Sequence, residues 1–277
     1  MVTEYLDIAY IPSEPQNPFH TFDVYVPEGS LHQHDASFPL VCFIHGGAWI
    51  SEDKSDHADL ARRLATSTGY PVAIPNYRLT PRQPTAENYL HHPEHAKDVL
   101  QFLEFVRSGH QSLGGPFPRP PTKLFLLGHS CAAHIICSIY LRMGKEKELS
   151  PSDDLAKSTA AIMLSEGIYD IDQLLSTFPK YREWFIEQAF GKLDSYQDFS
   201  AATASLSPDC RHIRWLIIHS RGDDLVDEGQ SRQMYNHLSE MNKERVAQTF
   251  GELTDGHDEI LQGNLYVDII TKYIKET

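Results

Sequence analysis

Apolar residues gather into short runs along the chain, and more polar stretches separate the runs. The segments 39–47, 70–79, 122–130 and 214–220 each contain several consecutive apolar residues. Between them, apolar residues recur every three to four positions, as in 91–109, which predicts amphipathic helices. Strands that are apolar at nearly every position are typical of a sheet buried on both faces. The pattern therefore predicts an α/β fold, with a mostly parallel central sheet and helices on both faces.

The other predicted elements continue this alternation. Strands are expected at 22–29, 160–170 and 246–250, and helices at 56–69, 131–144, 229–243 and 260–276, with a helical region running up to Phe190. The strands near the N-terminus alternate apolar and polar residues, so they are expected to start the sheet antiparallel. Because neither a repeat nor a low-complexity linker interrupts the chain, we predict a single domain over 1–277, with 1–38 forming N-terminal strands and a loop.

The composition excludes several classes of partner. The 277 residues include 41% hydrophobic and 22% charged residues, which is ordinary for a globular protein. The net charge of -14 argues against nucleic acid and anionic membrane surfaces, because both attract basic patches. No apolar run approaches the roughly 18 residues of a membrane-spanning helix. The first ten residues, MVTEYLDIAY, lack the basic and apolar parts of a signal peptide. A cytoplasmic protein is expected.

The cysteines and most histidines point to neither a disulfide nor a metal. Four cysteines are scattered without C-x-x-C spacing, which predicts reduced, buried thiols: Cys42, Cys131, Cys137 and Cys210. Five histidines stand close together in two groups but lack carboxylate or cysteine partners at ligand spacing: His32, His34, His91, His92 and His95. We therefore expect solvated loop and helix histidines, no metal and no cofactor. Arg78 and Asp98 are expected to form a structural ion pair.

One serine stands where a buried strand turns directly into a helix. The segment Gly128-His129-Ser130-Cys131-Ala132 joins the strand 122–130 to the helix 131–144, which is the context of a nucleophile elbow. Such a turn requires small residues two positions before and after the serine. Gly128 fulfils this and Ala132 departs from the usual glycine. The alternative is that Ser130 only caps the helix. His129 would point away from the site and serve the structure.

A candidate acid and a candidate base follow the last two predicted strands. Asp223 and Asp224 come after the strand 214–220, and His257 comes after the strand 246–250. Open α/β sheets place their sites at these carboxyl ends, and hydrolases of this class order the residues Ser, Asp, His. We prefer Asp223, which directly follows Gly222, and expect Asp224 to cap the next helix. The alternative for His257 is an ordinary surface loop residue.

Two adjacent glycines follow an early strand, in His45-Gly46-Gly47-Ala48-Trp49. Acyl transfer at Ser130 would create an oxyanion, and each fixed backbone donor that binds it is worth roughly 3 kcal/mol. The expected donors are the N–H groups of Gly46, Gly47 and Cys131. Glycine suits this place because a substrate oxygen has to approach the backbone closely.

These motifs resemble the α/β-hydrolase superfamily and its hormone-sensitive-lipase-like branch, through HGG, the Asn76–Leu79 sequence NYRL and GHS. More narrowly, the chain resembles the kynurenine formamidase (arylformamidase) family. The H-G-G-x-W motif, the segment LSEGIYDIDQLLSTFPKY at 164–181 and the stretch from His219 to Asp223 carry that resemblance. It covers most of the chain, from about Pro39 to the end.

The resemblance implies an α/β-hydrolase fold and hydrolysis of N-formyl-L-kynurenine to L-kynurenine and formate, in tryptophan breakdown. Ser130 would be the nucleophile that carries the formyl group, His257 the general base and acid, and Asp223 the orienting carboxylate. Trp49 and Tyr169 are candidates for the wall around the aromatic amine, although Trp49 alternatively packs the loop.

Two other functions remain open from the sequence. One is a general short-chain carboxylesterase that uses the same triad, and the other is a hydrolase-fold binding protein without activity. A bulky lipid substrate is not expected, because no long lid insertion is visible. The partner implied is a small-molecule substrate, and the oligomeric state, including a homodimer, is left open.

Overall fold

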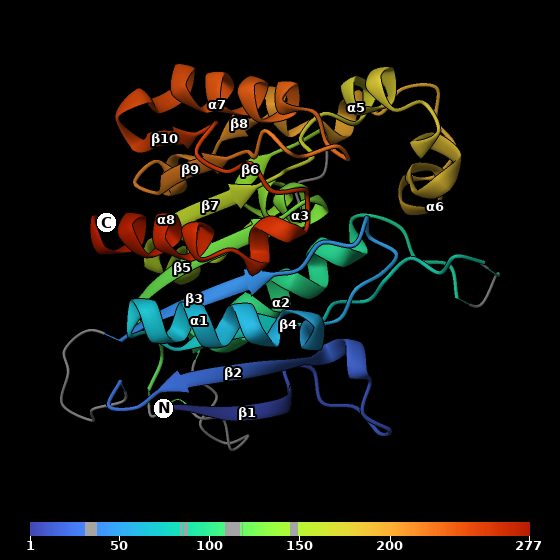
Figure 1. Cartoon of the computed structure of the whole chain (residues 1–277). Coiled ribbons are helices and arrows are strands. Elements are labelled where there is room, and N and C mark those ends of the chain that lie inside the picture. The colour runs from blue at the N-terminus through green and yellow to red at the C-terminus, as the bar shows by residue number, and fades with distance from the viewer. Residues whose placement is uncertain (31–37, 84, 86–87, 109–116, 118, 145–148) are drawn as a thin grey trace.

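The computed structural model describes residues 1–30, 38–83, 85, 88–108, 117, 119–144 and 149–277 (Figure 1). Within these residues, eight strands form one sheet in the order β1-β2-β4-β3-β5-β7-β9-β10. Their bounds are β1 Val2–Ala9, β2 Thr21–Pro27, β3 Pro39–Ile44, β4 Val72–Pro75, β5 Lys123–His129, β7 Thr159–Ser165, β9 Arg214–Ile218 and β10 Val246–Thr249. The pairs β1–β2 and β2–β4 are antiparallel and the other pairs are parallel. The predicted fold class and the antiparallel start are confirmed.

Helices cover both faces of the sheet (Figure 1). One face packs against α1 (Ala58–Thr68) and α8 (Asn264–Lys275). The other packs against α2 (Glu94–Ser108), α3 (Cys131–Tyr140), α4 (Asp153–Ser158) and α7 (Glu228–Asn242). In β3, the side chains of Leu40 and Cys42 belong to the core on the side of α2 and α3. Those of Val41 and Phe43 belong to the core on the side of α1 and α8. Because successive side chains of a strand face opposite sides, a sheet covered on both sides requires strands without polar gaps.

The connections place loops from opposite faces at one edge of the sheet. β3 lies between β4 and β5, and the chain leaves β3 toward α1 on one face but leaves β5 into α3 on the other. Ligands of open α/β sheets bind at such a switch point. The segment with α5 (Ile171–Thr177), the helical turn Arg182–Ile186 and α6 (Glu187–Phe190) lies at the same end of the sheet (Figure 1).

Several predicted elements differ in detail from the observed ones, and the strand expected over 160–170 ends at Ser165. The helix expected over 131–144 ends at Tyr140, because β6 (Leu141–Arg142) pairs with β8 (Ser205–Leu206) in a small second sheet that the apolar pattern does not predict. The region up to Phe190 is helical but broken into short pieces. The extent of a single domain over 1–277 stays a prediction.

The cysteines are free and buried, as predicted. The expectation of solvated histidines is wrong for His92 and His95, which are buried; His95 Nε2 lies 2.9 Å from Thr80 Oγ1, and burial lowers the pKa of His95 to about 3. His32 and His34 lie outside the described residues. The Arg78–Asp98 ion pair is confirmed at 2.7 Å. Among the described residues, every helix is too short or too polar to cross a bilayer.

Candidate active site

Ser130 occupies a strained turn between β5 and α3. Its φ of 56° and ψ of -124° lie in a region that residues other than glycine rarely adopt. A Cβ on Gly128 would stand 2.8 Å from Ile136 Cδ1 and 3.1 Å from the carbonyl of Ala132, so this turn requires glycine at 128. Ala132 itself fits, fully buried. The Ser130 hydroxyl makes no capping hydrogen bond to the described backbone of α3, which argues against the helix-cap interpretation.

The loops after β9 and β10 bring Asp223 and His257 together. His257 Nδ1 lies 2.8 Å from Asp223 Oδ2, in the geometry of a donated hydrogen bond. The other oxygen, Oδ1, accepts hydrogen bonds from the N–H groups of Leu225 and Val226 at 2.9 and 3.0 Å. His257 and Ser130 are nearly buried, and both line one cleft. The aspartate is therefore oriented on both oxygens.

The electrostatics keep this aspartate ionised. Burial opposes the charge on Asp223, but the hydrogen bond from His257 helps to lower its pKa below the ordinary value overall. Asp224 takes no part in this arrangement. It does not cap the following helix as expected, because the turn continues to Asp227, which precedes the first residue of α7.

The glycines after β3 approach the serine closely. A Cβ on Gly46 would stand 3.0 Å from Ser130 Cβ, and a Cβ on Gly47, whose φ is +87°, would stand 2.1 Å from the Ser51 carbonyl oxygen. A side chain is therefore excluded at Gly47, and at Gly46 it would push against Ser130. Tyr77, from the NYRL motif, lies with its hydroxyl 2.8 Å from the Gly46 carbonyl oxygen and stabilises the loop. This role of Tyr77 was not predicted from the sequence.

Cys131 links this loop to the start of α3. Its Sγ accepts a hydrogen bond from the Trp49 N–H at 3.3 Å. Burial raises the pKa of the Cys131 thiol to about 12, so the thiol stays neutral and does not compete with Ser130 as a nucleophile. The three expected oxyanion donors, Gly46, Gly47 and Cys131, thus belong to segments that lie against Ser130.

Gly47 and Gly69 offer a matched test of the expected oxyanion donors after β3. Gly47→Ala is expected to lower kcat about 100-fold, because the added Cβ displaces a loop that carries a donor. Gly69→Ala is the matched control, since Gly69 has a similar φ of +75°, has nothing within 4 Å of its added Cβ, and ends α1 away from the cleft. Steady-state kinetics of both variants check the prediction; equal kcat values would contradict it.

Trp49 and Tyr169 do not reach the cleft. Both side chains are fully buried. The Trp49 ring packs edge-on against His134 and Phe190. Tyr169 lies under Gly167, whose added Cβ would stand 2.4 Å from the Tyr169 hydroxyl. The expectation that they contact substrate is therefore corrected, and the alternative that Trp49 packs the loop is the one observed.

Other aromatic residues take their place. The cleft is lined by residues of the loops after β3, β5, β7, β9 and β10 and of the segment between α5 and α6: Gly47, Ala48, Ser51, Glu52, Ser130, Ile168, Tyr181, Trp184, Phe185, Leu225, Val226, His257 and Asp258. The aromatic residues Tyr181, Trp184 and Phe185 were not predicted as part of the site. Their signal was the spacing of three and four along one short helical turn, inside a segment assigned only as helical.

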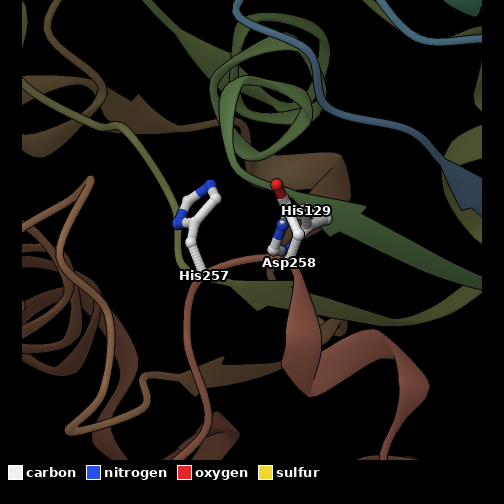
Figure 2. A group of neighbouring side chains, drawn as sticks. All are labelled: His129, His257 and Asp258. Atoms are coloured by element: carbon white, nitrogen blue, oxygen red, sulfur yellow. Dashed lines mark hydrogen bonds and ion pairs between the residues drawn. The ribbon is translucent and has the colours of Figure 1, made fainter.

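His129 lies beneath the histidine of the cleft. Figure 2 shows His129, His257 and Asp258 grouped between the end of β5 and the loop after β10. The centroids of the two imidazole rings are 4.7 Å apart. His129 Nδ1 lies 3.3 Å from Ser165 Oγ, and its Nε2 lies 3.3 Å from Asp258 Oδ1. Burial lowers the pKa of His129, so this ring is neutral and structural.

Two groups of described residues have ligand atoms close enough to consider a metal ion. They are His129, His257 and Asp258, and Glu166, His219 and Asp223, each with its atoms within 4.8 Å of one another. In both groups a metal would have to replace hydrogen bonds already made, between His129 and Asp258 in the first and between Asp223 and His257 in the second.

The chain resembles known proteins over most of its length. The family model BD-FAE matches residues 22–238. The chain belongs to the BD-FAE family. This BD-FAE protein is 25% identical over 279 residues to the kynurenine formamidase-like hydrolase fscH of Fusarium equiseti, covering 91% of this chain and 88% of that one. It is 27% identical over 284 residues to the kynurenine formamidase avaC of Aspergillus versicolor, covering 92% and 94%.

A solved structure supports the fold of the BD-FAE chain. Inhibited esterase B from Lactobacillus rhamnosis superposes with a TM-score of 0.73, covering 99% of this chain and 86% of that one, at 17% identity. The α/β-hydrolase fold and the resemblance to proteins named kynurenine formamidase are thereby confirmed. The BD-FAE chain is a hydrolase.

Proposed function

We propose that this protein hydrolyses aryl formamides, with N-formyl-L-kynurenine as substrate and L-kynurenine and formate as products. The observation that carries the proposal is the hydrogen bond between Asp223 and His257, at a cleft that also contains Ser130 on a strained turn. A nucleophile, an orienting acid and a base that follow one another along the chain in this order are the constellation of α/β-hydrolase-type serine hydrolases. The names of the relatives support a formamide as substrate.

In the proposed reaction, Ser130 Oγ attacks the formyl carbon and its proton passes to His257 Nε2. Asp223 holds the Nδ1–H and stabilises the imidazolium that forms. The N–H groups of the Gly46–Gly47 loop and of Cys131 bind the oxyanion of the tetrahedral intermediate.

The intermediate collapses when its C–N bond breaks, and the leaving arylamine takes the proton from His257. The formyl group remains as an ester on Ser130. Water then attacks this ester and gives its proton to His257, and formate leaves as the serine recovers its proton.

The cleft suits a small acyl group on an aromatic amine. Ala48 and Ile168 line the cleft together with Ser130, and we infer that these apolar side chains bound a pocket for a small acyl group. Tyr181, Trp184 and Phe185 supply an aromatic wall on which an aryl ring can pack. With four free cysteines, the compartment proposed is the cytoplasm.

One observation favours a second candidate, an esterase for small uncharged esters. The charged side chains that line the cleft are the carboxyl groups of Glu52 and Asp258, and no lysine or arginine of the described residues joins them. The hydrogen bond from His129 lowers the pKa of Asp258. Burial opposes ionisation of Glu52, but the hydrogen bond from His57 lowers its pKa overall. These carboxylates would thus repel the carboxylate of a substrate, whereas they would not repel an uncharged ester.

The test compares three substrates: N-formyl-L-kynurenine, the uncharged formanilide and p-nitrophenyl acetate. The proposal expects higher kcat/KM for the two formamides than for the ester. An ester preference of several orders of magnitude would contradict it and favour the second candidate. A fluorophosphonate probe tests the alternative of a binding protein without activity. A folded protein that forms no adduct on Ser130 would support that alternative.

A further inference from the structure

A second carboxyl group lies buried beside the aspartate of the proposed triad. Glu166 directly follows β7, and its side chain is completely excluded from solvent. Its Oε1 accepts a hydrogen bond from the Ser220 N–H at 2.8 Å. The backbone there is strained, with a φ of 53°. The reaction described above does not use this group, and burying a carboxyl group without a function or a partner is costly.

The other oxygen of Glu166 faces Asp223 and His219. Oε2 lies 3.3 Å from His219 Nδ1, and ligand atoms of all three residues lie within 4.8 Å of one another. His219 Nδ1 is closer to Ser231 Oγ, at 2.9 Å, and burial lowers the pKa of His219, so this imidazole is neutral. No cation among these residues therefore separates the two carboxyl groups.

Two neighbouring buried carboxyl groups without a cation between them cannot both be ionised. The number of donors decides which one keeps a proton. Asp223 receives hydrogen bonds from His257 Nδ1 and from two backbone N–H groups. Glu166 receives one, from Ser220, and no described donor bonds to its Oε2. The negative charge therefore belongs on Asp223 and the proton on Glu166.

We propose that Glu166 is a positioning residue, whose protonated carboxyl group donates a hydrogen bond from Oε2 to Asp223 and so fixes the carboxylate that orients His257. This inference rests on the proposed function of the site. It assigns no contact between Glu166 and substrate.

The electrostatics around Glu166 favour a proton on its carboxyl group. Burial, together with the hydrogen bond to Asp223 and the charge of Asp223, raises the pKa of Glu166 to about 10. The other titratable groups around it are Tyr169, Tyr266, His219 and, beyond Asp223, His257, while Asp227 and Glu228 act on His219. Burial raises the pKa of both tyrosines, so neither adds charge near neutral pH.

This arrangement has a consequence at alkaline pH. When Glu166 loses its proton, the donor to Asp223 disappears and two carboxylates repel each other. In Glu166→Gln the amide NH2 still donates to Asp223 and the amide oxygen still accepts from Ser220, but nothing titrates. In Glu166→Leu the donor is absent at every pH, and Asp223 then attracts the proton on His257 more strongly.

The experiment measures kcat/KM from pH 5.5 to 10.5 for the wild type, Glu166→Gln and Glu166→Leu, with Glu252→Gln, an exposed residue, as the control. The substrate is whichever of the three assay compounds is turned over best. The wild type and the control are expected to lose activity as pH rises past about 9.5, whereas Glu166→Gln keeps its plateau. Glu166→Leu is expected to lose about tenfold in kcat, and its acid limb moves to higher pH.

Thermal unfolding supplies a readout that needs no turnover. Folded Glu166 keeps a proton that the unfolded chain releases above its ordinary pKa of 4.5, so this group stabilises the protein less as pH rises toward about 10. Glu166→Gln lacks this dependence. The Tm of Glu166→Gln minus that of the wild type is therefore expected to increase from pH 6 to pH 9.

The outcomes separate this proposal from the proposed function. An alkaline limb in Glu166→Gln equal to that of the wild type, or a Tm difference independent of pH, would overturn the role of Glu166. Loss of activity on chelation, restored by Zn²⁺, would also overturn it, since Glu166 would then be a ligand. A wild type inactive on all three substrates would sink the proposed function, while the Tm series would still decide where the proton lies.

Discussion

Ser130→Ala is expected to lower kcat/KM at least about 10⁴-fold on any substrate that the protein hydrolyses. The reason is that the hydroxyl group is the atom to which the acyl group is transferred, and the neighbouring Cys131 thiol is neutral and cannot replace it. Alanine has a Cβ like serine, so the substitution leaves the backbone strain at the φ of 56° unchanged. The fold is therefore expected to persist. Steady-state kinetics together with circular dichroism measure both.

The matched control is Ser138→Ala. Ser138 lies on the same helix, α3, is buried like Ser130, and binds the His134 carbonyl oxygen through its hydroxyl group. The Ser138→Ala variant is expected to keep the wild-type activity and the wild-type labelling by a fluorophosphonate. Residual labelling of Ser130→Ala at the wild-type rate would show that another residue is the nucleophile and would refute the proposed mechanism.

The sheet was predictable because its physical signal is local. Leu40 to Ile44 are apolar in sequence, and each of these side chains is indeed buried. The turn at Ser130 was predictable for the same reason, since a tight strand-to-helix turn demands Gly128 within two residues of the serine. The positions of Asp223 and His257 followed from the rule that loops after parallel strands meet at one edge.

The substrate wall was not predictable in this way. Trp49 belongs to the motif that narrows the family, which suggested a contact with substrate. Trp49 packs within the loop instead, since its side chain is buried and its backbone N–H donates a hydrogen bond to Cys131 Sγ. The cleft is closed by Tyr181 and Trp184, from a segment whose direction over the sheet depends on long-range packing.

Glu166 was invisible to sequence reasoning for a related reason. A glutamate followed by glycine after a strand is typical of an exposed turn, and only the folded loops show that Ser220 and Asp223 surround it. Polar contacts between residues that are more than 30 positions apart leave no spacing pattern in the sequence. The same holds for Tyr77 and the carbonyl of Gly46.

The choice between two adjacent aspartates gives the second large effect. Asp223→Asn is expected to lower kcat about 10⁴-fold with little change in KM. An asparagine NH2 would donate to His257 Nδ1, where the carboxylate now accepts, and this would leave the proton on Nε2 and prevent it from taking the serine proton. KM is expected to hold because Asp223 is not among the residues that line the cleft.

Asp224→Asn is the control at the next position, and its kinetics are expected to stay within about twofold of the wild type. Asp224 is exposed, so removing its charge leaves the hydrogen bonds of Asp223 in place. Equal damage from both substitutions would mean that the loop as a whole, rather than one carboxylate, supports His257. The reverse order, with Asp224→Asn more damaging, would show that the loop changes register in solution and would refute the assignment of Asp223.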